Sequence, residues 1–152
     1  MQAISVVVAD PEKERRAACL RLLEQEKGIR VVAEAGTTAE TLGSARFSPS
    51  ILLLDSKLAL GRGTVLLPMF LRTSPSTRVI VLTGQSSLAA LMDALSYGAQ
   101  GYLTRRRLRA FLSKAVRKVA DGEAWIPRKV LPKIIERVAQ LGAAGAAGAA
   151  VT

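Results

Sequence analysis

Short apolar runs alternate with segments of helical periodicity along the first 121 residues of the chain. The apolar runs are four to seven residues long, and most are rich in valine, isoleucine or leucine, which is typical of strands buried on both faces. Five such strands, each followed by a helical pattern, predict an α/β fold in which helices cover both faces of a parallel sheet. The predicted strands are residues 4–9, 29–35, 51–54, 78–83 and 101–104.

The segments between the strands carry the spacing and the terminal residues of helices. Residues 108–119 have apolar side chains at i, i+3, i+4, i+7, i+8 and i+11, and Gly122 is expected to end this helix. Asp10 and Pro11 are expected to be the N-cap and the first residue of the first helix. Pro68 lies inside a predicted helix, which we therefore expect to be bent or short. The other predicted helices are residues 16–23, 64–72, 86–97 and a segment that starts with a capping box at residues 37–40.

The pattern changes after residue 122 and divides the chain into three parts. Residues 1–122 form the predicted α/β domain. Residues 123–141 hold a turn, in which Trp125 is expected to pack on the domain, and an amphipathic C-terminal helix with apolar residues at 130, 131, 134, 135, 138 and 141. Residues 142–152 are almost entirely glycine and alanine, and we expect them to form a flexible tail.

The composition excludes several classes of function but adds little to the prediction of the fold. The chain has one cysteine and no histidine, which argues against zinc sites, Ser-His or Cys-His catalysis and internal disulfides. The cysteine, Cys19, is expected to fill a helix face. No apolar run is long enough to cross a bilayer and the first residues lack a signal-peptide pattern, so we expect a cytoplasmic protein that does not enter membranes.

The net charge of +10 belongs mainly to the C-terminal third of the chain. Residues 101–152 contain 11 of the 22 basic residues but only 3 of the 12 acidic residues. A solvated basic face is one interpretation, and contact with nucleic acid or an acidic partner is the other. Aromatic residues that could stack on bases are few in this region. In the second interpretation the contacts are made by Arg105, Arg106, Arg107, Arg109, Lys114, Arg117, Lys118, Arg128, Lys129, Lys133 and Arg137.

Polar residues stand at the ends of several predicted strands. If the strand order is 2-1-3-4-5, as in flavodoxin-like doubly wound sheets, Asp10 and Asp55 follow adjacent strands and meet at one crevice. Two carboxylates at close range repel each other and favour a divalent cation, Mg²⁺ in particular. Thr83 and Arg105 end the next two strands and add a hydroxyl and a positive charge. Taken singly, Asp10 and Thr83 are also explained as helix or turn caps, but the four together indicate phosphoryl transfer.

Several motifs resemble the receiver domain of two-component response regulators, over about residues 3–121. The motifs are VVVAD at residues 6–10, LLLD at 52–55, VIVLT at 79–83 and GAQGYL at 98–103. The resemblance implies that Asp55 is the phosphoacceptor, which attacks a phosphodonor and becomes an aspartyl phosphate. It implies that Thr83 and Tyr102 are the switch residues. It also implies an Mg²⁺ ion held by Asp10, Asp55 and the backbone carbonyl of Lys57.

The chain is most similar to the NarL/FixJ group of this family. The segment DGEAWIP at residues 121–127, followed by a helix, resembles the exit from the receiver in that group, where it leads to a helix-turn-helix DNA-binding domain. The resemblance implies the regulatory part of a transcriptional regulator, a sensor histidine kinase or another signalling protein as partner, and a homodimer. No enzymatic activity is expected beyond self-phosphorylation on Asp55 from a kinase or a small phosphodonor. Contact with DNA is expected through a domain absent from this sequence, or weakly through the basic helices.

Four features of the sequence depart from the family pattern at the site. Ala9 replaces the first residue of the acidic pair, Arg105 stands at the lysine position, residues 58–59 are Leu-Ala instead of Met-Pro, and Gly84 follows the switch threonine. Loss of one acid is expected to weaken metal binding. Arginine is a planar fork on a longer stem, so Arg105 can pair directly with Asp55 in the phosphate position. Two states of the site stay open: a phosphorylated receiver, and a phosphorylation-independent pseudo-receiver with a metal-free, closed site. Nucleic-acid binding through the basic C-terminal third is the alternative function.

Overall fold

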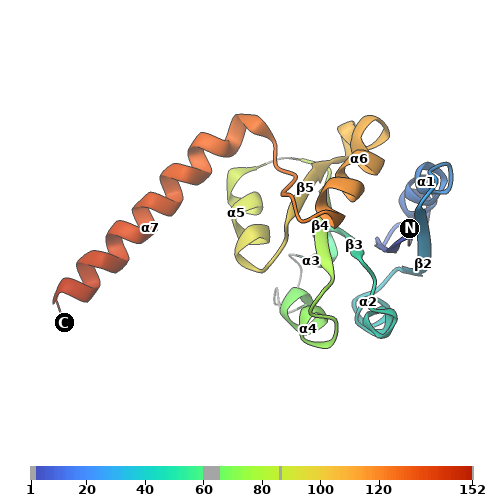
Figure 1. The fold of residues 1–152 in the computed structure, drawn as a ribbon, viewed down its shortest axis with the longest axis horizontal. Helices are drawn as coiled ribbons and strands as arrows, with labels where there is room; N and C mark the ends of the chain where they lie inside the picture. Colours follow the sequence, from blue (N-terminus) through green and yellow to red (C-terminus); the bar gives the residue numbers. More distant parts are fainter. Residues whose placement is uncertain (1–2, 60–65, 86, 152) are drawn as a thin grey trace.

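The computed structural model describes residues 3–59, 66–85 and 87–151 (Figure 1). Five parallel strands form one sheet in the order β2-β1-β3-β4-β5, which confirms the predicted flavodoxin-like doubly wound fold. Each strand begins and ends within one residue of its prediction, because its apolar run is bounded by polar or turn-forming residues. The strands are β1 (Ile4–Ala9), β2 (Ile29–Ala35), β3 (Ile51–Asp55), β4 (Arg78–Thr83) and β5 (Gly101–Thr104).

Helices cover both faces of this sheet and bury two apolar clusters against it. On one face, Cys19, Leu112 and Val116 of the helices pack with alternate residues of the strands. On the other face, Phe70 and Leu91 pack with the intervening strand residues. The first face is covered by α1 (Lys13–Glu24) and α6 (Leu108–Ala120). The second is covered by α2 (Thr38–Gly43), the 3₁₀ turn η1 (Ser44–Phe47), α3 (Ser56–Ala59), α4 (Leu66–Thr73) and α5 (Leu88–Ser96).

The start of the first helix differs from its prediction. α1 begins at Lys13 with Glu12 as its N-cap, so the prediction that Asp10 and Pro11 begin this helix is wrong. Asp10 instead accepts a hydrogen bond from the Glu12 N–H at 2.8 Å and turns its carboxylate toward arginine side chains at the rim of the sheet. Its hydrogen-bonding capacity is therefore used by the turn and by the site.

The other helices largely follow their patterns. Thr37 caps α2 by accepting a hydrogen bond from the Glu40 N–H, as the capping box predicts. α4, which contains Pro68, has eight residues, as expected of a short helix. Residues 64, 65 and 86 of the predicted helices lie outside the described residues. The four-residue α3 was not predicted, because one helical turn is too short to show a period.

The turn around Trp125 packs on the domain, as predicted. The indole lies against Phe111 of α6, with ring centroids 5.8 Å apart. The backbone of Trp125 pairs with the edge strand β5: its N–H donates to the Gln100 carbonyl at 3.1 Å, and its carbonyl accepts from the Tyr102 N–H at 2.8 Å. This pairing covers part of the sheet edge and fixes where the chain leaves the domain.

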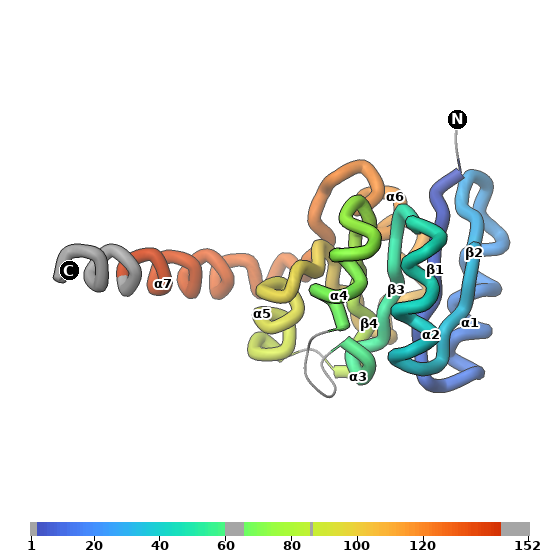
Figure 2. The backbone as a smooth tube through the Cα atoms, turned by 90° about the horizontal axis from the view of Figure 1, so that it is seen from below, coloured from blue at the N-terminus to red at the C-terminus, as the bar shows by residue number. Residues whose placement is uncertain are grey.

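The C-terminal helix α7 (Leu131–Val151) is longer than predicted. The structure continues it through the Gly/Ala segment 142–151, where the sequence predicted a flexible tail. Alanine has the highest helix propensity of all residues, and this offsets part of the cost of about 1 kcal/mol for each glycine. Ile134 in the first turn packs against the domain. The rest of α7 projects away from the sheet (Figures 1 and 2) and leaves Ile135, Val138 and Leu141 exposed.

The contact between Gly101 and the core gives a test of the fold. A Cβ added at Gly101 would lie 2.9 Å from Ile80 Cγ1 and 3.3 Å from Val119 Cγ2. We expect Gly101→Ala to lower the free energy of unfolding by about 1–3 kcal/mol, the usual cost of overpacking. Urea denaturation measures the change. Gly43→Ala is the matched control, because its added Cβ meets nothing within 4 Å. Equal stability of the two variants would contradict the packing described above.

Candidate functional site

The predicted site residues gather where the strands end. Asp10 follows β1 and Asp55 ends β3, and the two strands are neighbours in the sheet, with Ala9 beside Leu54. Their carboxylates are almost completely buried, with relative exposures of 1% for Asp10 and 2% for Asp55. Two buried carboxylates this close together need positive charge beside them, because an unpaired buried ion is strongly destabilising.

Arg105 supplies that positive charge to both acids. It follows β5 as the first residue of the 3₁₀ turn η2 (Arg105–Arg107). Its Nη2 donates to Asp55 Oδ1 at 2.6 Å and also to Asp10 Oδ2. One guanidinium nitrogen thus bridges the two carboxylates, and this matches the direct pairing between Arg105 and Asp55 that the sequence left open.

A second arginine completes the cluster. Arg15 Nη2 of α1 lies 3.1 Å from Asp10 Oδ1 and 3.7 Å from Asp55 Oδ1, and its Nη1 lies 2.6 Å from Glu12 Oε2. Burial opposes the charge of Arg15, but the hydrogen bond that it donates to Asp10 and the charges of all three acids outweigh this effect and raise the pKa of Arg15 above the ordinary value. Sequence reasoning missed Arg15. The available signal was its spacing, five residues after Asp10 and three after Glu12 at the start of a helix.

The remaining predicted residues lie at or near the same rim with other partners. The Lys57 N–H donates to Asp55 Oδ2 at 2.9 Å, so both carboxylate oxygens of Asp55 are engaged. The Thr83 hydroxyl donates to the backbone carbonyl of Gln85 at 2.8 Å rather than to Asp55. Tyr102 lies on β5 and is buried, and its hydroxyl has no hydrogen-bond partner among the described residues.

The arrangement does not fit a metal ion. The guanidinium groups of Arg105 and Arg15 lie against the carboxylates of Asp10 and Asp55. A Mg²⁺ ion between these carboxylates would be repelled by both positive charges. Ala9, which stands at the position of a further acid, is packed in an apolar cluster. Within the described ranges, no group of three acidic, histidine or cysteine side chains could hold a metal. The charge that a divalent ion would bring is supplied here by Arg105 and Arg15.

The fold and this rim of acids define a receiver of the two-component type. The family model for the response regulator receiver domain matches residues 6–117, and the chain belongs to this family. Receiver domains of this family generally bind Mg²⁺, so the two-arginine cluster is a departure from the usual site.

Curated relatives point to transcriptional regulators. The chain is 27% identical over 136 residues to the DNA-binding transcriptional activator DevR/DosR of Mycobacterium tuberculosis, an alignment that covers 89% of this chain and 63% of the relative. It is 29% identical over 132 residues to the response regulator GacA of Pseudomonas syringae, covering 86% of this chain and 62% of the relative. The chain therefore spans less than two thirds of the length of these relatives.

Solved structures agree with this assignment. The signal receiver domain of the response regulator NarL from Mycobacterium tuberculosis superimposes with a TM-score of 0.73 at 28% identity, over 81% of this chain and all of that one. The isolated receiver domain of RcsB from Salmonella enterica, in its apo form, has a TM-score of 0.78 at 24% identity, over 88% of this chain and 98% of that one. At 24% identity, the similarity to the RcsB receiver domain is evidence for the fold alone.

Among the described helices, none is both long enough and apolar enough to cross a membrane.

The bridging role of Arg105 can be tested through stability. We expect Arg105→Met to lower the free energy of unfolding by roughly 2–4 kcal/mol, because breaking a buried ion pair costs about 3–5 kcal/mol and Arg15 retains part of the charge balance. Chemical denaturation of both proteins measures this. Arg106→Met is the matched control, since Arg106 is exposed and surface changes usually stay within about 0.5 kcal/mol. If both variants keep the stability of the unchanged protein, the ion cluster does not hold the rim together.

Cys19 lies on the buried side of α1, and the reactivity of its thiol tests whether this side of the helix is packed as described. Burial raises the pKa of its thiol to about 11, and the nearby charge of Arg105 offsets this only in part. The thiol is therefore protonated at neutral pH and poorly nucleophilic. We expect a disulfide reagent such as DTNB to label the native protein slowly at pH 8 and the guanidinium-unfolded protein at once. Rapid, complete labelling of the native protein would show that the thiol is accessible.

Proposed function

We propose that this chain is a pseudo-receiver, a receiver domain that acts through protein contacts without being phosphorylated on Asp55. The observation that carries the proposal is the position of Arg105 Nη2, which lies 2.6 Å from Asp55 Oδ1 and also bonds Asp10. An aspartate acts as a nucleophile only if one oxygen is free to approach phosphorus in line. Here Oδ1 is covered by Arg105, and Oδ2 accepts from the Lys57 N–H.

Opening this site would be costly. A phosphodonor could reach Asp55 only after the Arg105 side chain had left the cluster, because its guanidinium lies where the incoming phosphoryl oxygens would have to lie. That movement would leave Asp10 and Asp55, both buried, with Arg15 alone to balance them. The closed ion cluster therefore opposes phosphorylation of Asp55. The Thr83 hydroxyl, which donates to the Gln85 carbonyl, would then have no phosphoryl group to bind.

The output of such a domain is a surface for other proteins. We infer that the chain is the regulatory part of a transcriptional regulator, as suggested by its relatives, one of which is named a DNA-binding transcriptional activator. A homodimer, or a complex with a histidine kinase or another signalling protein, would use the exposed helices on either side of β5. The protein would act in the cytoplasm and would catalyse no reaction of its own.

Phosphorylation of designed variants tests this proposal. Incubated with Mg²⁺ and acetyl phosphate, the unchanged protein is expected to gain no phosphoryl adduct by intact mass spectrometry. Arg15→Ala combined with Arg105→Lys is expected to gain one, because the pair removes both guanidinium groups and restores the compact cation that the family places after β5. Adding Asp55→Asn to the double variant should abolish the adduct.

The unchanged protein provides the decisive outcome. A stoichiometric adduct on Asp55 of that protein would overturn the proposal and make the chain a phosphorylated receiver. Circular dichroism spectra of the variants, matched to that of the unchanged protein, ensure that a missing adduct reflects chemistry and not unfolding.

A further inference from the structure

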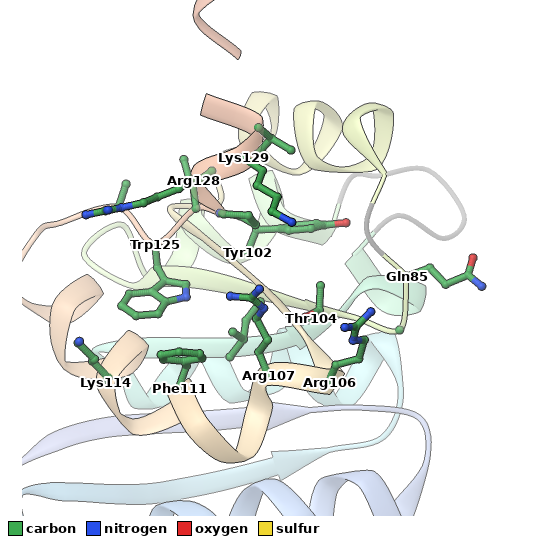
Figure 3. A pocket seen from close by; sticks show the side chains of 16 residues that line it. Gln85, Tyr102, Thr104, Arg106, Arg107, Phe111, Lys114, Trp125, Arg128 and Lys129 are labelled. Carbon is green, nitrogen blue, oxygen red and sulfur yellow. The ribbon is translucent and has the colours of Figure 1, made fainter. Parts of the chain in front are cut away.

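A groove beside β5 lies apart from the ion cluster of Asp10, Asp55, Arg15 and Arg105, although Tyr102 and Gln85 are among its lining residues. It has a volume of about 1130 Å³ and runs between the β5–α6 region and the segment that leads into α7. Figure 3 shows that Arg106, Arg107, Phe111 and Lys114 reach it from η2 and α6. Arg128 and Lys129 reach it from the opposite wall, formed by the 3₁₀ turn η3 (Arg128–Val130), and the ring of Trp125, from the connecting segment, lies beside Phe111.

The charge of this groove has one sign. None of its lining residues is acidic. Within the described part of the chain, none of its basic side chains forms an ion pair with a carboxylate. Several cations that face one groove without counter-charges repel each other and attract an anion. The basic lining residues are Arg106, Arg107, Lys114, Arg128 and Lys129.

The start of α6 strengthens this field. α6 begins at Leu108 with Arg107 as its N-cap, with no side-chain cap and no acid in its first turn. The N-terminal end of a helix carries partial positive charge, so the arginines of η2 lie at the end where cations are least favoured. An anion bound in the groove would relieve this repulsion.

The floor of the groove is aromatic and apolar. Phe111 and Trp125 lie with their rings tilted by 46°, and the Arg107 guanidinium carbon is 6.0 Å from the centroid of the Phe111 ring. Ile126 and Pro127 continue the apolar lining. A flat ring can be held between such aromatic and guanidinium groups, with dispersion and cation–π attraction contributing to affinity.

We propose that this groove binds a nucleotide, with its phosphates held by the cations and its base held against Trp125 and Phe111. Cations on both walls suit phosphate groups, because guanidinium and ammonium groups are strong donors to phosphate oxygens. One pair of aromatic rings suits a single base, whereas a long single strand is usually held by a succession of stacking residues. The ligand would contact both walls at once, so it would fix the segment that carries α7 and make its position depend on ligand.

The single tryptophan of the chain lines the groove and gives a direct readout. ATP and GTP are titrated into the full chain while Trp125 fluorescence is followed, and calorimetry on the same samples gives the affinity independently. We expect saturable binding that is stronger for each nucleotide than for its nucleoside or for pyrophosphate. Arg107→Ala and Arg128→Ala are each expected to weaken it about tenfold, the loss typical of one charge-assisted hydrogen bond.

Arg109→Ala is the matched control, because Arg109 is exposed on α6 and does not line the groove. The nucleotide affinity of this variant should stay within about twofold of that of the unchanged protein, as expected for a surface charge that does not contact the ligand. Equal weakening in Arg109→Ala would reduce the effect to overall charge and overturn the site. The proposal also fails if ATP and GTP do not bind, if pyrophosphate binds as well as they do, or if only a single-stranded oligonucleotide or a polyglutamate peptide binds. Melting curves of each variant show that these outcomes concern binding and not folding.

Discussion

Two carboxylates buried side by side at one rim of the sheet impose the constraint on which the rest of the structure depends. Taking an ion out of water costs several kcal/mol even after the protein relaxes, so Asp10 and Asp55 require positive charge within contact distance. Arg105 and Arg15 provide it from two separate elements, the end of β5 and helix α1. The ion cluster therefore ties together two central strands, an edge strand and a helix. In the proposed pseudo-receiver, the same contacts also keep a phosphodonor away from Asp55.

Most of the fold could be predicted from the sequence because it rests on local, repetitive signals. The five strands are bounded apolar runs, and α6 has one uninterrupted apolar stripe, so their ends follow from composition and period. The meeting of Asp10 with Asp55 follows from the strand order 2-1-3-4-5 of flavodoxin-like doubly wound sheets. The start of α1 could not be predicted in this way, because Asp10 is paired with Arg15 and with Arg105, which is 95 residues away in sequence.

The rest of the site depends on long side chains whose direction no local pattern fixes. Arg15 is one of several basic residues on α1, and apart from its spacing from Asp10 and Glu12 only its tertiary contacts distinguish it from Arg21 or Lys13. The pairing of Arg105 with Asp55 was foreseen as one of two possibilities, but its simultaneous contact with Asp10, which is 95 residues away in sequence, depends on the tertiary structure. The helical Gly/Ala segment is a different case, because alanine and glycine have opposing effects on helix formation and their balance cannot be judged from composition alone.

The length of α7 has a mechanical consequence. Its 21 residues correspond to an arm of about 30 Å at 1.5 Å per residue, and its first turn rests on the domain through Ile134. A rotation of about 10° at the base of such an arm carries its far end through roughly 5 Å, close to the pitch of one helical turn. The arm starts next to a segment whose backbone is paired with β5. A small rearrangement at this edge of the sheet is therefore magnified along α7 into a displacement of its far end, large enough to change which surfaces of an assembly that end can reach.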